Sequence, residues 1–244
     1  MDKELREKII ELFEYRQLPA LIRFGGNDWD QEYYEKLITL QFQIYKLDHE
    51  LESHWEVELT TIDKRWEKIY EALRALNIPQ KVHDRYCRHI YKYQKHELDI
   101  RNMKLPTRLS MEYFYFYKSC DVKLLRKIIY KNNPLLAKVI KESQWRLFDL
   151  VTEVNDDIAD LQEDVTTING NRFLISLKQL GKEATEQTFG DFLDEIAERN
   201  DQEKISFETI DLNEWTSIQV EETKELMKAQ IKAFDSLKVG MEIM

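Results

Sequence analysis

Apolar residues recur at intervals of three or four along most of the chain, a spacing that predicts α-helices with one buried face. The longest pattern covers residues 30–59, and another extends over some 30 residues from 134 to 166. Shorter helices are expected over residues 2–16, 62–76, 80–103, 111–131, 171–181, 184–200 and 212–238. No segment shows the sustained alternation that is typical of β-strands. The pattern therefore predicts an all-α helical bundle of eight to ten helices.

Polar residues and glycine mark the expected helix ends. Residues 18–28 are predicted to form a connection, with Asp28 or Asp30 capping the helix that follows. Ser110 has the side chain of an N-cap, and Gly170 is expected to end the helix over 134–166 in the left-handed conformation. Only 6 Gly and 4 Pro interrupt the 244 residues, and no linker divides them. We therefore expect one domain that spans residues 1–244.

Composition excludes several classes of protein. No run of about 18 apolar residues is present, so no stable membrane insertion is expected. The charged N-terminus does not resemble a secretory signal, and Cys87 and Cys120 have no spacing typical of a metal site or a disulfide framework. A cytoplasmic location is therefore expected. The net charge of −10 disfavours a general nucleic-acid binder.

The charge is distributed unevenly. Residues 1–60 carry 14 acids and 7 bases, residues 81–130 carry 5 acids and 12 bases, and residues 149–244 carry 23 acids and 9 bases. A basic centre between acidic flanks suits a polyanion bridged by metal ions, because carboxylates bind the metals and basic residues bind the anion. A solvated basic face explains the same numbers equally well.

Three aspartates follow each other at one-turn spacing late in the chain. Asp156, Asp160 and Asp164 would share one face of a helix, with Asp157 pointing elsewhere. Clustered carboxylates in apolar surroundings raise one another's pKa unless a cation neutralises them. Mg²⁺ is the natural cation, since it prefers oxygen ligands. The alternative is a solvated acidic face near a helix end.

A second acid pair stands on the long helix over 30–59. Asp48 and Glu52 are one turn apart and therefore share a face. Two helices that each offer an acid pair can supply metal ligands from two walls of a cavity. A pair of surface carboxylates is the alternative interpretation of the same spacing.

These segments resemble the class I terpenoid synthase superfamily. Residues 153–164 are similar to its second metal motif, in the DDxxD form of prenyl diphosphate synthases, the triad of terpene cyclases and the DxxED of squalene and phytoene synthases. Residues 45–52 resemble the first aspartate-rich motif, with His49 where a second Asp is usual. Between them, residues 106–120 are similar to the stretch in which a basic residue, here Lys118, senses the diphosphate.

The resemblance implies a single-domain bundle of that type and a chemistry. About three Mg²⁺ ions would be held by Asp48, Glu52, Asp156, Asp160 and Asp164. Lys118 and Arg172 would stabilise the departing diphosphate of an isoprenoid diphosphate substrate. Aromatic side chains would line the cavity of the carbocation, the candidates being Tyr45, Phe114, Tyr117, Trp145 and Phe148. The expected enzyme is a terpene synthase, a carbon–oxygen lyase that cyclises or rearranges the cation.

Two other functions fit the sequence. One is a prenyl-coupling synthase of the trans-prenyl or squalene and phytoene type, which joins two isoprenoid units. The other is a non-catalytic helical interaction protein whose acidic faces keep it in solution. Enzymes with this resemblance often dimerise, so a homodimer is included among the expected assemblies. Catalytic triads and Gly-rich phosphate loops have no supporting motif in the chain.

Overall fold

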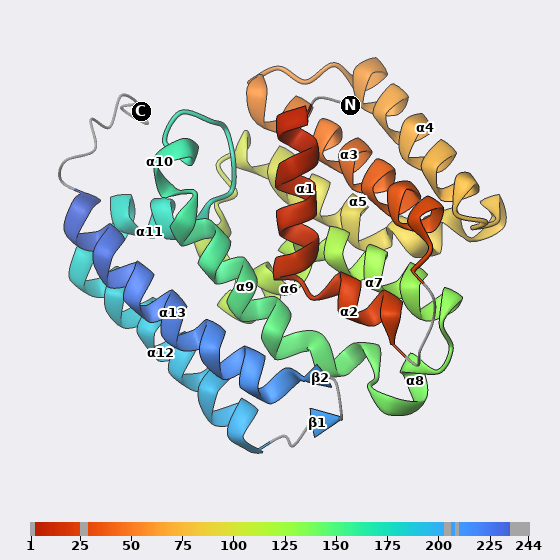
Figure 1. The fold of residues 1–244 in the computed structure, drawn as a ribbon. Coiled ribbons are helices and arrows are strands. Elements are labelled where there is room, and N and C mark those ends of the chain that lie inside the picture. Colours follow the sequence, from red (N-terminus) through yellow and green to blue (C-terminus); the bar gives the residue numbers. More distant parts are fainter. Residues whose placement is uncertain (1–2, 25–28, 203–205, 208–209, 235–244) are drawn as a thin grey trace. The chain divides into compact units, whose positions relative to one another are not determined.

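The computed structural model is built almost entirely of helices (Figure 1). It describes residues 3–24, 29–202, 206–207 and 210–234. These residues form thirteen α-helices, three short 3₁₀ helices and two paired two-residue strands. The all-α prediction is confirmed, and the number of helices exceeds the eight to ten expected. No helix among the described residues is long and apolar enough to cross a membrane.

The chain forms two compact units, each continuous in space but not in sequence. The first comprises Met1–Lys95 and Cys120–Glu142, and the second comprises His96–Ser119 and Ser143–Met244. The expected single domain over residues 1–244 stays a prediction.

The first unit is a group of helices packed around α3. Its elements are α1 (Lys3–Tyr15), α2 (Leu18–Arg23), α3 (Gln31–Ser53), α4 (Leu59–Ala75), η1 (Gln80–Val82), most of α5 (His83–Ile100), α7 (Cys120–Asn132) and α8 (Leu136–Val139). The helix α3 packs along α4, α1 and α7. Its buried face includes Leu37, Ile44 and Leu51, which recur at seven-residue intervals and so stay on one side of the helix.

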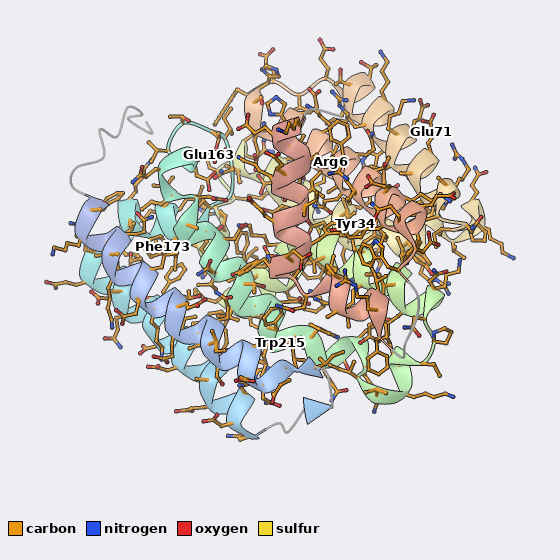
Figure 2. The ribbon with its side chains drawn as sticks, in the orientation of Figure 1. Arg6, Tyr34, Glu71, Glu163, Phe173 and Trp215 are labelled. Carbon is orange, nitrogen blue, oxygen red and sulfur yellow. The ribbon has the colours of Figure 1, made fainter. Side chains whose placement is uncertain are left out.

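Aromatic contacts and one ion pair join the helices of this unit. Phe13 of α1 meets Tyr34 of α3 edge to face, with ring centroids 5.7 Å apart. On the surface of the same two helices, Arg6 donates to Glu35 at 2.6 Å. Figure 2 labels Arg6 and Tyr34 in this part of the chain. The apolar contact accounts for most of the stabilisation, since an exposed ion pair contributes only about 0–1 kcal/mol.

The second unit is centred on α9. Its elements are the last turn of α5, η2 (Pro106–Arg108), α6 (Met111–Lys118), most of η3 (Glu142–Trp145), α9 (Arg146–Ala159), α10 (Leu161–Asp164), α11 (Arg172–Leu180), α12 (Lys182–Gln202), β1 (Ser206–Phe207), β2 (Ile210–Asp211) and α13 (Leu212–Ala233). The helices α12 and α13 lie side by side, and both pack against α9 (Figure 1). The apolar side of α9, including Leu150, Val154 and Ile158, is fully buried.

Several predicted helix ends are confirmed and others are wrong. Asp30 caps α3 by accepting from Tyr33 N at 2.9 Å, and Ser110 caps α6. The expected connection over residues 18–28 is wrong in its first part, because Leu18–Arg23 forms α2 with Pro19 in its first turn. Residues 25–28, which include Asp28, lie outside the described residues.

The continuous helix expected over residues 134–166 is also wrong. It is divided into α8, η3, α9 and α10, since Ile140 turns to extended backbone and buries its side chain, and α9 ends at Ala159. Asp160 forms the C-cap of α9. The helix is thus interrupted within the series Asp156, Asp160 and Asp164, where like charges one turn apart repel one another and disfavour a helix.

Gly170 lies close to the last turn of α5 and has no left-handed conformation. Among the described glycines only Gly181 has a positive φ, so the predicted conformation at Gly170 is wrong. A Cβ at Gly170 would stand 3.0 Å from Glu97 Oε1 and 3.2 Å from Ile100 Cδ1. A larger residue there would require the ends of these two side chains to move by a few tenths of an ångström.

The fold predicts one measurable effect on stability. Asn200, buried near the end of α12, donates to Asn213 O and Ser217 Oγ, both at 2.9 Å. Asn200→Ala should lower the free energy of unfolding by about 1–3 kcal/mol in urea denaturation, because it removes the two hydrogen bonds that this buried amide donates. The exposed Glu198→Ala on the same helix should change it by less than about 0.5 kcal/mol. An equal effect of both variants would contradict the assigned role of Asn200.

Candidate functional site

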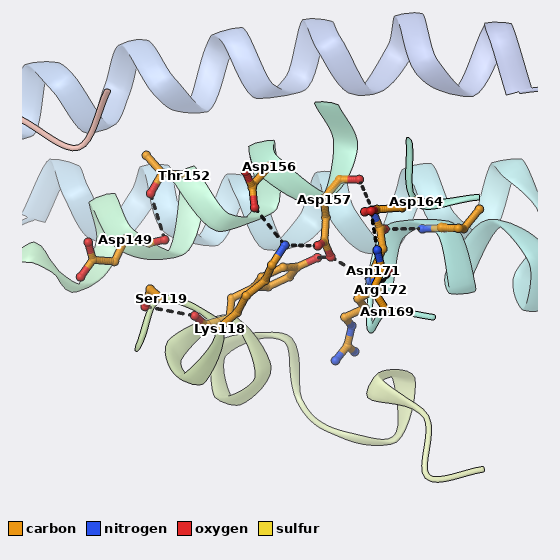
Figure 3. Close-up of polar contacts among 12 residues, drawn as sticks. Lys118, Ser119, Asp149, Thr152, Asp156, Asp157, Asp164, Asn169, Asn171 and Arg172 are labelled. Atoms are coloured by element: carbon orange, nitrogen blue, oxygen red, sulfur yellow. Dashed lines mark hydrogen bonds and ion pairs between the residues drawn. The ribbon is translucent and has the colours of Figure 1, made fainter. Parts of the chain in front are cut away.

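The end of α6 meets the last turn of α9 at a buried lysine. Lys118, the final residue of α6, donates through Nζ to Asp156 Oδ2 at 3.1 Å and also to Asp157 Oδ1 (Figure 3). The side chain of Lys118 is 16% exposed, that of Asp156 43% and that of Asp157 0%. Lys118 thus joins one carboxylate inside the unit to another that reaches solvent.

Asp157 is the centre of this cluster. Besides Lys118, its carboxylate accepts from the hydroxyl of Tyr115 and from the backbone N–H of Arg172, both at 2.8 Å. Arg172 is the first residue of α11, so the carboxylate also lies at the positive end of that helix. Asp157 therefore holds α6, α9 and α11 together, and its expected place off the face shared by Asp156, Asp160 and Asp164 stays a prediction.

Asn171 ties the loop before α11 to the same cluster. Its Nδ2 donates to the carbonyl of Asp157 at 2.6 Å and to Asp164 Oδ2 at 2.7 Å, while its Oδ1 accepts from Leu174 N as the N-cap of α11. The other oxygen of Asp164 accepts from Asn169. Both carboxylate oxygens of Asp164 are thus engaged by amides of its own loop.

Asp160 stands between Asp156 and Asp164 in the sequence, and its surroundings disfavour the ionised form of its carboxyl. Its side chain keeps an exposed surface, but the protein around it desolvates the carboxylate, and the negative charge of Asp156 adds to this effect. Together they raise the pKa of Asp160 to about 7. The pKa of Asp164 is also raised, chiefly by burial, with the bond from Asn171 acting in the opposite direction. This end of α9 therefore has more negative charge than Lys118 neutralises.

Lys118 itself stays charged. Burial alone would lower its pKa, but the neighbouring charges of Asp157, Asp156 and Glu153 raise it well above the ordinary value. Burial and the charge of Asp157 likewise raise the pKa of Tyr115, which keeps its hydroxyl as a donor. The cluster is therefore a cation held by a buried anion, with a second group of anions at the surface.

The side chain of Arg172 makes contacts inside the second unit. Its Nη1 donates to the carbonyls of Pro106 and Leu109 at 2.9 and 2.8 Å, and its guanidinium carbon lies 5.9 Å from the centroid of the Phe114 ring. Burial lowers its pKa. In this arrangement the side chain fixes the η2 segment, so contact with a diphosphate stays a prediction.

The aromatic candidates of the second unit belong mainly to its core. Phe114, Trp145 and Phe148 are buried, and Trp145 meets Phe148 edge to face at 6.0 Å. Tyr117 is partly exposed and packs against Tyr113 at 4.9 Å. Their use as lining for a carbocation stays a prediction.

The remaining candidates lie in the first unit. Tyr45, Asp48 and Glu52 are on α3 and are partly exposed. Asp156, Asp160 and Asp164 belong to the second unit. The expected metal site with ligands from both acid groups therefore stays a prediction.

The donor set suits Mg²⁺ only in part. Across the described residues, no group of three or more His, Cys, Asp or Glu side chains is arranged to hold a metal ion. The oxygens of Asp157 and Asp164 are engaged by internal donors, which leaves Asp156 and Asp160 as the carboxylates that fit. Two carboxylates are enough for Mg²⁺ when phosphate oxygens complete its coordination.

Four residues of the cluster were not among the predicted site residues: Tyr115, Asp157, Asn169 and Asn171. A signal for Asp157 exists in the apolar pattern, because it lies three and seven residues after Val154 and Leu150 and so falls on their buried side. A charged residue at such a position requires buried partners. Nothing local indicates that Tyr115 supplies one of them.

Comparison of the chain with known protein families, with curated proteins and with solved structures gives no match. The chemistry of the second unit therefore has to be inferred from its own residues.

The raised pKa of Asp160 predicts a pH-dependent stability. Between about pH 4 and pH 7 the carboxyl of Asp160 stays protonated in the folded state but is ionised in the unfolded state, so the folded state loses stability progressively as pH rises through this range. Asp160→Asn should therefore raise the free energy of unfolding at about pH 8 and change it little at about pH 4.

Urea denaturation at both pH values measures this effect. Asp191→Asn, on an exposed part of α12, is the matched control and should behave alike at the two pH values. Equal effects of Asp160→Asn at the two pH values would contradict the assigned repulsion.

Proposed function

We propose that the chain is a Mg²⁺-dependent enzyme of the class I terpenoid synthase type. It would ionise an allylic isoprenoid diphosphate, release diphosphate and cyclise or rearrange the remaining carbocation. The observation that carries this proposal is the end of α9, where Lys118 faces Asp156 and where Asp160 is costly to ionise without a further cation. A metal–diphosphate ligand would supply what both groups need: positive charge for the acids and negative charge for the lysine.

Asp156 and Asp160 are the residues that would hold Mg²⁺. The metal would supply positive charge to the leaving diphosphate, as a Lewis acid does in phosphate chemistry. Asp156 is 43% exposed, so its carboxylate can accept a ligand from solution. The resemblance implies about three ions, with the others drawing on Asp164, Asp48 and Glu52.

Lys118 would bind the diphosphate without losing its internal anchor. Its bond to the exposed Asp156 can be exchanged for one to a phosphate oxygen, while its bond to the buried Asp157 keeps the ammonium in place. Tyr115 and the N–H of Arg172 hold that anchor at 2.8 Å. A donor that is positioned before the reaction needs little reorganisation when charge develops on the leaving group.

The aromatic residues on α6 support the second part of the proposal. Phe114 and Tyr117 lie on the helix that ends at Lys118. Rings near the leaving group can stabilise an allylic cation through their negative faces and keep water away from it. Tyr45, Trp145 and Phe148 are the other candidates for this lining.

One observation favours a second function, that of a non-catalytic helical interaction protein. Asp157 is completely buried and receives three internal donors, so this part of the cluster is complete without a ligand. In that case Lys118 would only hold helices together. Titration of the protein with Mg²⁺ and inorganic diphosphate separates the two, since a structural cluster should show no metal-dependent binding of diphosphate.

The proposal predicts the effect of removing the acids. Asp156→Ala and Asp160→Ala should each lower turnover of allylic diphosphates of different chain length by at least about 100-fold, because each removes a charge that acts on the transition state. Asp191→Ala, which removes an exposed acid of α12, is the control and should keep full turnover. Full turnover in Asp156→Ala with folding intact would contradict the proposal. The product mass separates cyclisation from coupling. A cyclised product keeps the carbon count of one substrate, whereas a coupled product has the summed carbon count of two substrates.

The role of Lys118 has its own test. Lys118→Gln should weaken inhibition by inorganic diphosphate about tenfold or more, since a charge-assisted hydrogen bond is lost. Lys224→Gln removes a lysine of α13 that pairs with Asp194 of α12 and Glu221 of α13. This variant should leave inhibition by inorganic diphosphate unchanged. If both variants bound diphosphate like the wild type, Lys118 would not be a diphosphate ligand.

A further inference from the structure

A group of basic residues in the first unit lies on α5 and α7, outside the proposed catalytic site. The two helices are joined there, because Lys127 Nζ donates to the carbonyl of Arg85 at 3.3 Å. All members of the group are exposed or partly exposed. The basic patch, as it is called below, consists of Arg85, Arg88, His89, Lys92, Lys123 and Lys127.

Three residues of this patch, Arg85, Arg88 and Lys127, differ in their ion pairs from some other bases of the first unit. Lys36 pairs with Glu32 at 2.6 Å and Lys68 with Glu71 at 2.8 Å, each with an acid one turn away. In the part of the chain that the structure describes, no such ion pair is formed by the three patch residues Arg85, Arg88 and Lys127. In a chain with a net charge of −10, three neighbouring bases without such an ion pair point to a ligand.

The pKa values of His89 and Lys127 are lowered in part by the positive charges around them. Burial and then the charges of Lys123, Arg88, Lys127 and Lys92 lower the pKa of His89 to about 4. Burial also lowers the pKa of Lys127, and Arg85 and Arg88 lower it further, although Glu142 acts against them. These residues therefore lie close enough to repel one another, and a common anion would relieve that repulsion.

The nearby acids do not pair with Arg85, Arg88 or Lys127. Asp84 on α5 and Glu142 after α8 are both exposed, and their charges act on Cys87 and Lys127. Neither forms an ion pair with Arg85, Arg88 or Lys127. The ring of Tyr86 lies 4.6 Å from Lys127 Nζ and 6.0 Å from the guanidinium carbon of Arg85, which places two cations around one aromatic face.

We propose that the basic patch is a binding site for a compact phosphate-type oxyanion, with Arg85, Arg88 and Lys127 as ligands and His89 taking up a proton from solvent on binding. Several cations around one point suit a multivalent anion, and arginine forks match phosphate oxygens. The patch extends over only two turns of α5 and one of α7, which fits a small anion. The acidic remainder of the chain would repel a long polyanion.

This site is independent of the proposed catalytic function. Its residues belong to the first unit, whereas Lys118 and Asp156 belong to the second. It needs no metal ion, so binding measured without Mg²⁺ and retained in Lys118→Gln would be assigned to the patch. Failure of either proposal would leave the other standing.

Calorimetric titration with inorganic phosphate, in the absence of Mg²⁺, tests the patch. The double variant Arg88→Ala/Lys127→Ala should bind at least about tenfold more weakly than the wild type, because two charge-assisted bonds are lost. The matched control Lys36→Ala/Lys68→Ala removes two lysines of the same unit that pair with acids, and it should bind like the wild type. Equal weakening in both double variants would mean non-specific attraction and would overturn the proposal.

His89 supplies a local readout. At about pH 5 and without phosphate its ring should be mostly neutral, since its pKa is about 4. With phosphate bound, an opposite charge nearby should raise the pKa by about one unit or more. The Cε1–H nuclear magnetic resonance signal, assigned with His89→Gln, should then move toward the protonated position. A signal that stays fixed while phosphate saturates the protein would place the anion elsewhere and contradict the proposal.

Two further measurements complete the test. Should the double variant lose its circular dichroism spectrum, Arg88→Glu replaces it, since Arg88 is exposed and has no hydrogen bond or ion pair in the described structure. Vesicles of phosphatidylcholine with and without phosphatidic acid separate a lipid headgroup from a free anion as the source of phosphate. Binding to acidic vesicles alone that depends on Arg88 would support the site with a headgroup as its ligand. Binding to neither probe would overturn it.

Discussion

The second unit depends on a carboxylate that is removed from water. Asp157 is completely buried, and an isolated buried anion would cost many kcal/mol. Lys118, Tyr115 and the backbone of Arg172 offset that cost together. Because these donors come from α6 and α11, the requirement to satisfy one carboxylate fixes the positions of both helices along α9. A buried pair of this kind specifies an arrangement more than it adds net stability.

The same interaction creates the chemistry at the end of α9. Lys118 is anchored on its buried side, so its remaining hydrogen-bonding capacity is directed toward Asp156 and the surface. Asp160 follows where α9 ends, and its raised pKa records negative charge that the protein leaves uncompensated. In the first unit the basic patch shows the opposite imbalance. The two units thus contain charged groups of opposite sign, acids at the end of α9 and bases on α5 and α7.

Local sequence signals predict local features well. The caps at Asp30 and Ser110 follow from side chains that bond to the next turn of backbone, and the all-α class follows from apolar periodicity. The pairing of Lys118 with Asp156 agrees with placing both in one site. The buried role of Asp157 and the use of Arg172 on the η2 carbonyls depend on which helices pack against α9. That information lies in contacts between residues distant in the chain, so a local pattern does not contain it.

A double-mutant cycle on Lys118 and Asp157 measures the central interaction directly. Lys118→Met, Asp157→Asn and the double variant would be compared with the wild type by urea denaturation at neutral pH. We expect each single variant to lose about 3 kcal/mol or more, because each leaves a buried group without its partner, and the double variant to lose less than the sum of the two. A coupling energy below about 0.5 kcal/mol, as in an exposed pair, would contradict the account.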